Sequence, residues 1–223
     1  MIEIKINKHL YKRDPEETLL GKKFLSKSIE LIERIGFEEF TFKKLAVEAE
    51  STEASMYRYF ENKHKLLIYL VSWYWAWQEY QILYKIQGTS DPILKLKNAI
   101  AVLISENKKN PNFAHINEQL LSKIVILEAS KTYFTINVDD INKDGVFNAY
   151  KSLCGLIASI ILDINPSYTH ARALSTTLLE GIHHHIFYSQ HLPSLTDFKK
   201  DDLNYQEIGS FYEKLILNQI QSK

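Results

Sequence analysis

Residues 41–67 read T-F-K-K-L-A-V-E-A-E-S-T-E-A-S-M-Y-R-Y-F-E-N-K-H-K-L-L, and they contain two short helical patterns. The first helix should begin after Thr41, because threonine caps helix N-termini well. Apolar residues then recur at the spacing of one helical face, namely Phe42, Leu45, Ala46 and Ala49. A second helix is expected from Ser51 or Thr52 to about Phe60. The pair forms either a helix-turn-helix or a helical hairpin buried in a bundle.

The second helix of this pair mixes small, polar and aromatic residues on its expected outer face. These residues are Glu53, Ala54, Ser55, Arg58 and Tyr59. Met56 and Phe60 should point inward. A helix that lies in the major groove of DNA needs small or polar outer residues, so that its backbone can approach the base edges. The composition of this face is therefore compatible with a recognition helix.

Helical patterns continue on both sides of the pair, and strand patterns are nearly absent. A helix is expected from about Glu16 until Gly36 ends it, and a long one from about Asn62 to Gln87, before Gly88. Few glycines and prolines interrupt the chain. We predict an all-α protein of about nine helices, with the helix pair in a domain at 1–64, including an N-terminal arm at 1–15, and a second helical domain at 65–223.

The composition sets limits on the class of protein. The 223 residues carry a formal net charge of zero, so any attraction to nucleic acid must come from local placement of charge. The single cysteine, Cys154, excludes an intrachain disulfide, and we expect a cytoplasmic protein with a buried core thiol. No secretory signal is visible, and the longest apolar run is too short for a membrane span.

The segment from G-K-K-F-L-S-K-S-I-E-L-I-E-R-I-G-F through residue 67 resembles the DNA-binding segment of the TetR/AcrR family of bacterial transcriptional regulators. The resemblance rests on Thr41, Leu45-Ala46, Ala49, Met56-Tyr57-Arg58-Tyr59-Phe60, Asn62-Lys63 and Leu66-Leu67. It implies an all-helical homodimer that binds double-stranded DNA at a palindromic operator and responds to a small molecule. It also implies phosphate contacts by Thr41, Lys43 and Lys63, and groove contacts by Thr52, Ser55, Tyr57, Arg58 and Tyr59.

Three residues depart from the pattern of the family. Glu50 stands where the family usually has a turn glycine, and a left-handed backbone at this position would cost about 1 kcal/mol. Ser51 replaces a small apolar residue. Glu53 replaces a residue that is often basic, which weakens the attraction to phosphate. These departures concern affinity and operator sequence more than the fold.

The resemblance implies a ligand pocket, and the chain has aromatic residues that suit one. Trp73, Tyr74 and Trp77 share one face of the long helix, although such residues more often form core packing. His115, Phe147 and Tyr150 are further candidates. A small apolar or aromatic effector is expected to bind there and to release the DNA.

The last two helices have apolar faces that suit the four-helix dimer interface of the family. The candidate interface residues are Leu174, Leu178, Gly181, Ile182, Ile208, Phe211, Tyr212 and Leu215. The same faces would also suit a core that these helices simply close. Two-fold symmetry would match a palindromic operator.

Two other functions are compatible with the sequence. A helical-bundle enzyme could use Glu180, His184 and His191, whereas the consecutive residues 183–185 point about 100° apart on a helix and cannot chelate one ion. A family member with a vestigial pocket would bind DNA constitutively. We expect a repressor rather than an enzyme, with no cofactor and no metal.

Overall fold

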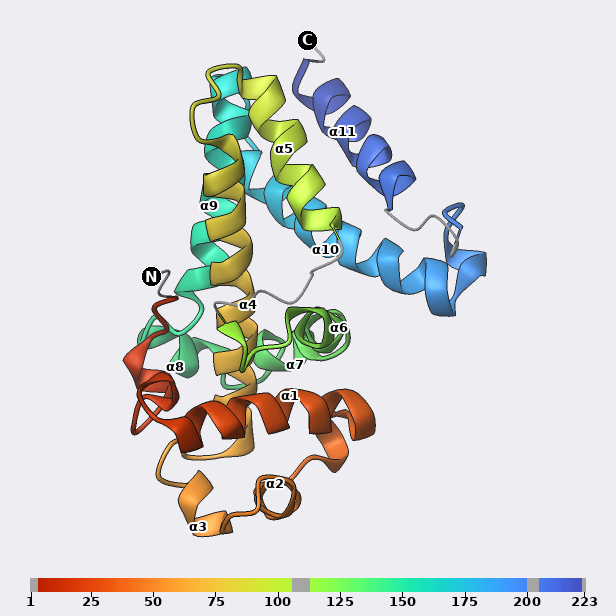
Figure 1. Ribbon diagram of the computed structural model, residues 1–223. Helices are drawn as coiled ribbons and strands as arrows, with labels where there is room; N and C mark the ends of the chain where they lie inside the picture. The colour runs from red at the N-terminus through yellow and green to blue at the C-terminus, as the bar shows by residue number, and fades with distance from the viewer. Residues whose placement is uncertain (1–3, 106–112, 200–204, 222–223) are drawn as a thin grey trace. The chain divides into compact units, whose positions relative to one another are not determined.

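The computed structural model describes residues 4–105, 113–199 and 205–221, and the regular secondary structure in this part of the chain is entirely helical (Figure 1). The prediction of an all-α fold is confirmed. The helices are α1 Leu19–Glu39, α2 Phe42–Glu48, α3 Glu53–Met56, α4 Lys63–Ile86, α5 Pro92–Ile104, α6 Glu118–Glu128, α7 Ser130–Tyr133, α8 Val138–Lys143, α9 Asn148–Ile164, α10 Ala171–His191 and α11 Gln206–Gln221. Short 3₁₀ helices lie at Lys8–Leu10, Pro15–Glu17 and Pro193–Leu195.

The described residues form two compact units. The first contains residues 4–76 and 113–149, and the second contains residues 77–105, 150–199 and 205–221. The division lies inside α4 rather than before it, and it groups α6, α7 and α8 with the N-terminal helices. The reason is that α6 packs against α1, a contact between helices that are far apart in sequence.

In the first unit, α1 forms the support on which the helix-turn-helix packs. Thr18 caps this helix, since its hydroxyl accepts a hydrogen bond of 2.9 Å from the Gly21 N–H. The apolar face of α1 is buried through Phe24, Leu25, Ile29, Leu31 and Ile32. Gly36 has φ 76°, which interrupts the helical path as the sequence predicts, and the chain then turns toward α2.

The long helix α4 begins and ends at the expected signals. The Asn62 side chain accepts a hydrogen bond of 2.9 Å from the Lys65 N–H, and Gly88 has φ 76° just after the end of the helix. Between them, Trp73 and Trp75 are fully buried. None of the described helices is both long enough and apolar enough to cross a bilayer.

The second unit has its core where α5, α10 and α11 pack together. Its buried apolar residues include Leu96, Ile100, Leu178, Ile182, Ile208 and Ile216. Gly181 allows α10 and α11 to approach closely, because a Cβ at this position would overlap the Tyr212 ring. The two C-terminal helices are therefore packed on each other within a single chain.

Candidate nucleic-acid interface

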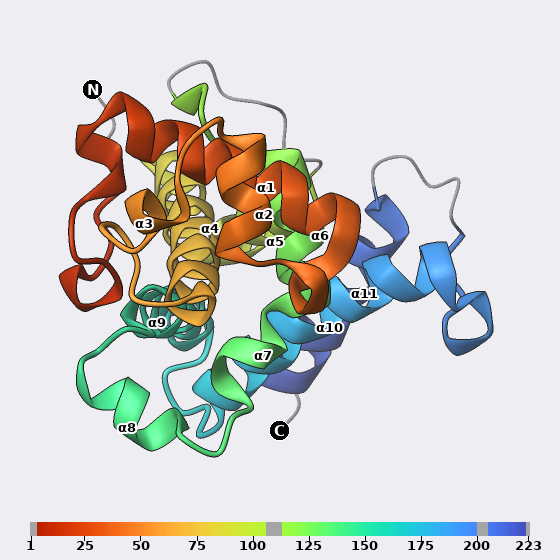
Figure 2. The same ribbon diagram turned by 90° about the horizontal axis from the view of Figure 1, so that it is seen from below.

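The helices α2 and α3 form a capped helix-turn-helix, seen from below in Figure 2. The Thr41 hydroxyl accepts a hydrogen bond of 3.2 Å from the Lys44 N–H, and the Thr52 hydroxyl accepts one of 3.3 Å from the Ser55 N–H. Met56 anchors α3 to the core beneath it. Both expected N-caps are present, but α3 ends at Met56 rather than near Phe60.

The outer face of α3 and of the turn after it contains an unpaired guanidinium. Thr52, Glu53, Ala54 and Arg58 are exposed, and Ser55 is half-buried. Across residues 4–105, 113–199 and 205–221, the Arg58 side chain has no hydrogen-bond or ion-pair partner. Tyr57 is 45% exposed, and its ring packs edge-on against Phe42 at 5.1 Å. Thr41 and Lys43, at the start of α2, are exposed as well.

Tyr59 does not lie on this face, so its expected groove contact is wrong. The side chain is 2% exposed, its hydroxyl is 2.7 Å from the Thr18 hydroxyl, and its ring packs edge-on against Phe24 at 5.5 Å. The expectation assumed helical geometry as far as Phe60. Because α3 ends at Met56, four residues earlier, the chain turns and Tyr59 points inward.

Lys63 was expected to contact phosphate, but its ammonium group is occupied within the protein. Nζ donates to the carbonyl oxygens of Phe37, Glu38 and Phe40 at 3.1, 3.0 and 3.1 Å, and it lies 4.8 Å from the centre of the Phe37 ring. Lysine has three donors, and all three are used. These carbonyls lie at the C-terminal end of α1, after the break at Gly36, where carbonyls need partners from outside the helix. The Phe37 carbonyl also accepts a hydrogen bond of 3.3 Å from the Phe40 N–H, and Lys63 donates to all three.

Glu50 adopts the left-handed backbone that the family resemblance implies for the turn, with φ 51°. Its carboxylate forms an exposed ion pair of 3.0 Å with Lys23, which contributes little in water. We expect Glu50→Gly to raise the free energy of unfolding by about 1 kcal/mol, because glycine adopts this conformation without strain. Chemical denaturation measures this change. Glu50→Ala loses the same ion pair but keeps the strain, so a matching gain in Glu50→Ala would contradict the explanation.

The predicted pocket residues are each engaged inside their own unit. In the first unit, Trp73 and Tyr74 are buried, and Phe147 packs edge-on against Tyr133. His115 instead bonds Glu16, with Nε2 at 2.7 Å from Oε2, and it lines an open depression beside Lys22, Lys23 and Lys27. The surroundings of His115 are thus charged.

The other two candidates, Trp77 and Tyr150, belong to the second unit. The Trp77 ring stacks on Tyr80 at 5.5 Å, and the Tyr150 hydroxyl donates a hydrogen bond of 2.6 Å to Glu180. Trp77 is buried, whereas Tyr150 is half-buried. The lining of a ligand pocket by these six residues stays a prediction.

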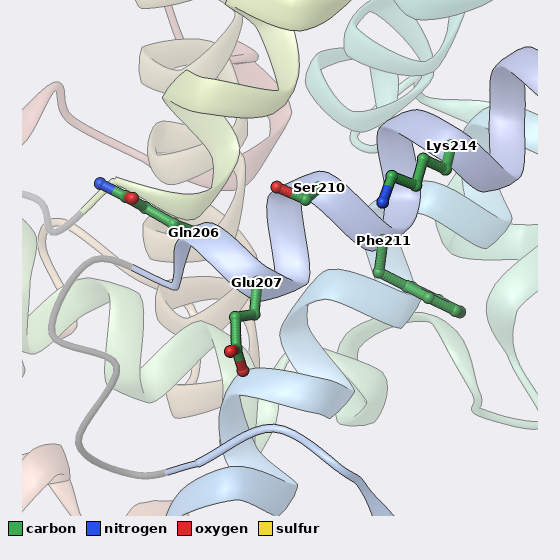
Figure 3. A pocket seen from close by; sticks show the side chains of 5 residues that line it. All are labelled: Gln206, Glu207, Ser210, Phe211 and Lys214. Carbon is green, nitrogen blue, oxygen red and sulfur yellow. The ribbon is translucent and has the colours of Figure 1, made fainter.

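Half of the predicted dimer residues belong to the core of the second unit. Leu178, Ile182, Ile208 and Tyr212 are at most 3% exposed in the single chain, so they cannot form a free surface. Phe211 and Leu215 on α11 are 43% and 40% exposed. Leu174 and Gly181 are half-buried. Figure 3 shows Phe211 in an open depression along α11, which is also lined by Gln206, Glu207, Ser210 and Lys214.

The side chains of the alternative enzyme site have separate neighbours. The His184 ring stacks on Tyr188 at 5.8 Å, and the His191 ring lies 4.7 Å from Phe187. In the part of the chain that the structure describes, no group of three histidine, cysteine or acidic residues is placed to hold a metal ion.

Burial also controls the titration of two groups in this unit. It lowers the pKa of the His183 imidazole to about 4, and the neighbouring His184 acts in the same direction. It raises the pKa of the Cys154 thiol to about 11, with a smaller effect of the Glu180 carboxylate. His183 is therefore neutral near pH 7, and Cys154 is a buried, protonated thiol, as predicted.

Comparison with known proteins supports the helix-turn-helix assignment and the fold. Residues 24–70 match the family of bacterial regulatory proteins called the tetR family. No curated protein matches the sequence.

Three solved structures share the fold at low sequence identity. The fatty acid degradation regulator FadR from Bacillus halodurans has TM-score 0.64 and 15% identity, covering 92% of this chain and 98% of that one. A putative tetR family transcription regulator from Shewanella sp. PV-4 has TM-score 0.61 and 15% sequence identity, and the match covers 92% of this chain and 97% of that one. AibR, in complex with isovaleryl coenzyme A and operator DNA, has TM-score 0.57 and 16% sequence identity, and the match covers 86% of this chain and 95% of that one. Residues 24–70 therefore match the N-terminal segment of the tetR family of bacterial regulatory proteins, and the chain shares the fold of these three solved structures.

Proposed function

We propose that the protein is a homodimeric repressor that binds a palindromic operator and releases it when a small apolar or aromatic molecule binds. The observation that carries the DNA-binding part is the exposed face of α3 and its following turn, with Thr52, Ser55, Tyr57 and Arg58 held on a packed and capped helix-turn-helix. Such a face, projecting from a buried anchor at Met56, suits insertion into a major groove.

Arg58 is the side chain on this face that can make a bidentate contact to guanine. We expect Arg58→Ala to lose about 1–3 kcal/mol of base discrimination at one position of each half-site. Selection of binding sites from a random duplex library, with the wild type and the variant in parallel, measures this effect.

Arg58→Lys is the matched control, because it keeps the positive charge but not the planar, two-pronged donor. It should preserve most of the affinity and its salt dependence, yet relax the same position of the half-site. If both variants instead weaken all sequences evenly, Arg58 contacts the DNA backbone, and base recognition must come from Ser55 or Tyr57.

The homodimer would rest on the exposed side chains of α11. Phe211 and Leu215 are large apolar residues left about two-fifths exposed in the single chain, on a helix whose opposite face is already packed through Ile208, Tyr212 and Ile216. A second copy that covers this face would place two helix-turn-helix units about a two-fold axis. The two-fold symmetry of such a dimer would match that of a palindromic operator.

Release by a ligand requires that the effector binds more tightly to a state that fits the operator poorly. Among the proteins that share the fold, AibR is complexed with isovaleryl coenzyme A and FadR regulates fatty acid degradation. These relatives favour a small organic effector for this chain also. Trp73, Tyr74 and Trp77, all on α4, remain the candidate contacts.

A further inference from the structure

The helix-turn-helix has too little positive charge to attract DNA by itself. Residues 41–61 contain three basic residues, Lys43, Lys44 and Arg58, against four acidic ones, Glu48, Glu50, Glu53 and Glu61. Lys44 is further neutralised by an ion pair of 3.1 Å with Glu39. Because contacts of lysine and arginine with phosphate supply most of the affinity of DNA-binding proteins, additional cations are needed near α3.

The N-terminal segment 5–13 carries this charge. It contains four basic residues, Lys5, Lys8, Lys12 and Arg13, and no acidic residue. All four side chains are exposed. Within the described residues, none of the four forms an ion pair, so their charge is available to a partner.

Three hydrogen bonds tie the segment to the rest of the first unit. The Lys12 N–H donates to the Tyr59 carbonyl at 2.7 Å, the Lys65 ammonium donates to the His9 carbonyl at 3.2 Å, and the Asn7 amide donates to the Asp144 carbonyl at 2.7 Å. Two of these bonds join it to the end of the helix-turn-helix and to the start of α4.

Side-chain packing adds to these bonds. Leu10 is 1% exposed, and the Tyr11 ring packs edge-on against Tyr69 at 6.0 Å. Its basic residues are therefore held in place.

Lys12 and Arg13 lie next to the residues that follow α3. The Lys12 backbone bonds Tyr59, and the Arg13 guanidinium is 5.8 Å from the centre of the Tyr59 ring. Tyr59 immediately follows Arg58 in the chain. We propose that Lys12 and Arg13 are a second part of the DNA interface, which binds phosphates beside the groove that α3 enters. This inference rests on the proposed function. The two residues would increase the affinity for DNA without contributing to the recognition of base sequence.

The test uses the double variant Lys12→Ala/Arg13→Ala of the full chain and the duplex selected by the wild type. Loss of two phosphate contacts per subunit should reduce the slope of log K against log salt by about 1.8 per half-site, and should weaken binding roughly 10- to 100-fold near 0.1 M salt. The selected base sequence should not change. An unchanged salt slope in the double variant would overturn the inference.

Two matched variants separate phosphate contact from other effects. Lys85→Ala/Arg172→Ala removes two exposed charges from the second unit and should leave the slope as in the wild type. Lys12→Arg/Arg13→Lys keeps both positive charges and should therefore keep the wild-type salt slope. A slope reduced as in the alanine variant would show that packing on Tyr59, and not phosphate contact, causes the change. A wild type that selects no duplex would overturn the proposed function together with this inference, whereas a binding wild type with a normal slope in the alanine variant would overturn the inference alone.

Discussion

Replacing Lys63 with methionine is expected to lower the free energy of unfolding by about 3 kcal/mol. The three backbone carbonyls that Lys63 bonds, at Phe37, Glu38 and Phe40, lie where α1 breaks and turns toward α2. Hydrogen bonds to a charged donor contribute about 1.5–3 kcal/mol each, and partial exposure of this corner reduces their sum. Methionine has a similar length and keeps the apolar contact with the Phe37 ring, so the lost bonds dominate the change. Urea denaturation, followed by circular dichroism, measures it.

Lys43→Met is the control for this experiment. Lys43 is an exposed lysine of the same helix-turn-helix, and no hydrogen bond of its side chain is found in the described part of the chain, so its stability change should stay within about 0.5 kcal/mol. If Lys63 contacted phosphate instead, Lys63→Met would leave stability unchanged and would lower the salt slope of DNA binding by about 0.9 per half-site. That outcome would contradict the structural role.

The corner that Lys63 supports is also held from α6. The Glu128 carboxylate accepts a hydrogen bond of 3.1 Å from the Phe37 N–H, and Lys131 bridges Glu128 and Glu38 at 2.8 Å each. Residues 36–40 are thus fixed from the first residue of α4 and from the last residue of α6. The position of the helix-turn-helix therefore depends on both helices.

Local signals in the sequence predicted several boundaries of the N-terminal helices. Thr41 and Thr52 cap helices through their own side chains, and Gly36 and Gly88 adopt positive φ where the helical patterns end. These features depend on a few neighbouring residues, so they can be read without knowledge of the fold. The left-handed backbone at Glu50 was instead implied by the family resemblance, since the family usually has a turn glycine at this position.

Side-chain roles that depend on distant contacts could not be predicted. Lys63 meets carbonyls 23–26 residues earlier in the chain, and Glu128 meets an N–H that is 91 residues away. Tyr59 was misplaced because α3 ends at Met56, before the helical geometry that the prediction assumed. Helical periodicity identified apolar faces on α10 and α11, but it does not distinguish a face covered by the same chain from one covered by a partner.

Leu215→Lys is expected to convert the proposed dimer to a monomer. Leu215 is 40% exposed in the single chain, and so a lysine there can extend into water when the protomer is alone. In a two-fold dimer that covers α11, the substitution would place an unpaired ammonium from each subunit in an apolar contact, at a cost of several kcal/mol. Sedimentation velocity of the wild type and the variant at micromolar concentration measures the change.

Leu94→Lys makes the same substitution at a leucine of α5 that is 46% exposed, and it should leave the wild-type sedimentation coefficient unchanged. Thermal unfolding separates lost association from lost folding, since the single chain already exposes both leucines and neither protomer should unfold. In the wild type and in Leu94→Lys, the melting temperature should rise with protein concentration, because association stabilises the folded state. In Leu215→Lys this dependence on concentration should disappear. If Leu215→Lys still sediments as the wild-type dimer, the contact between subunits does not involve this face of α11, and the two helix-turn-helix units must be paired through another surface.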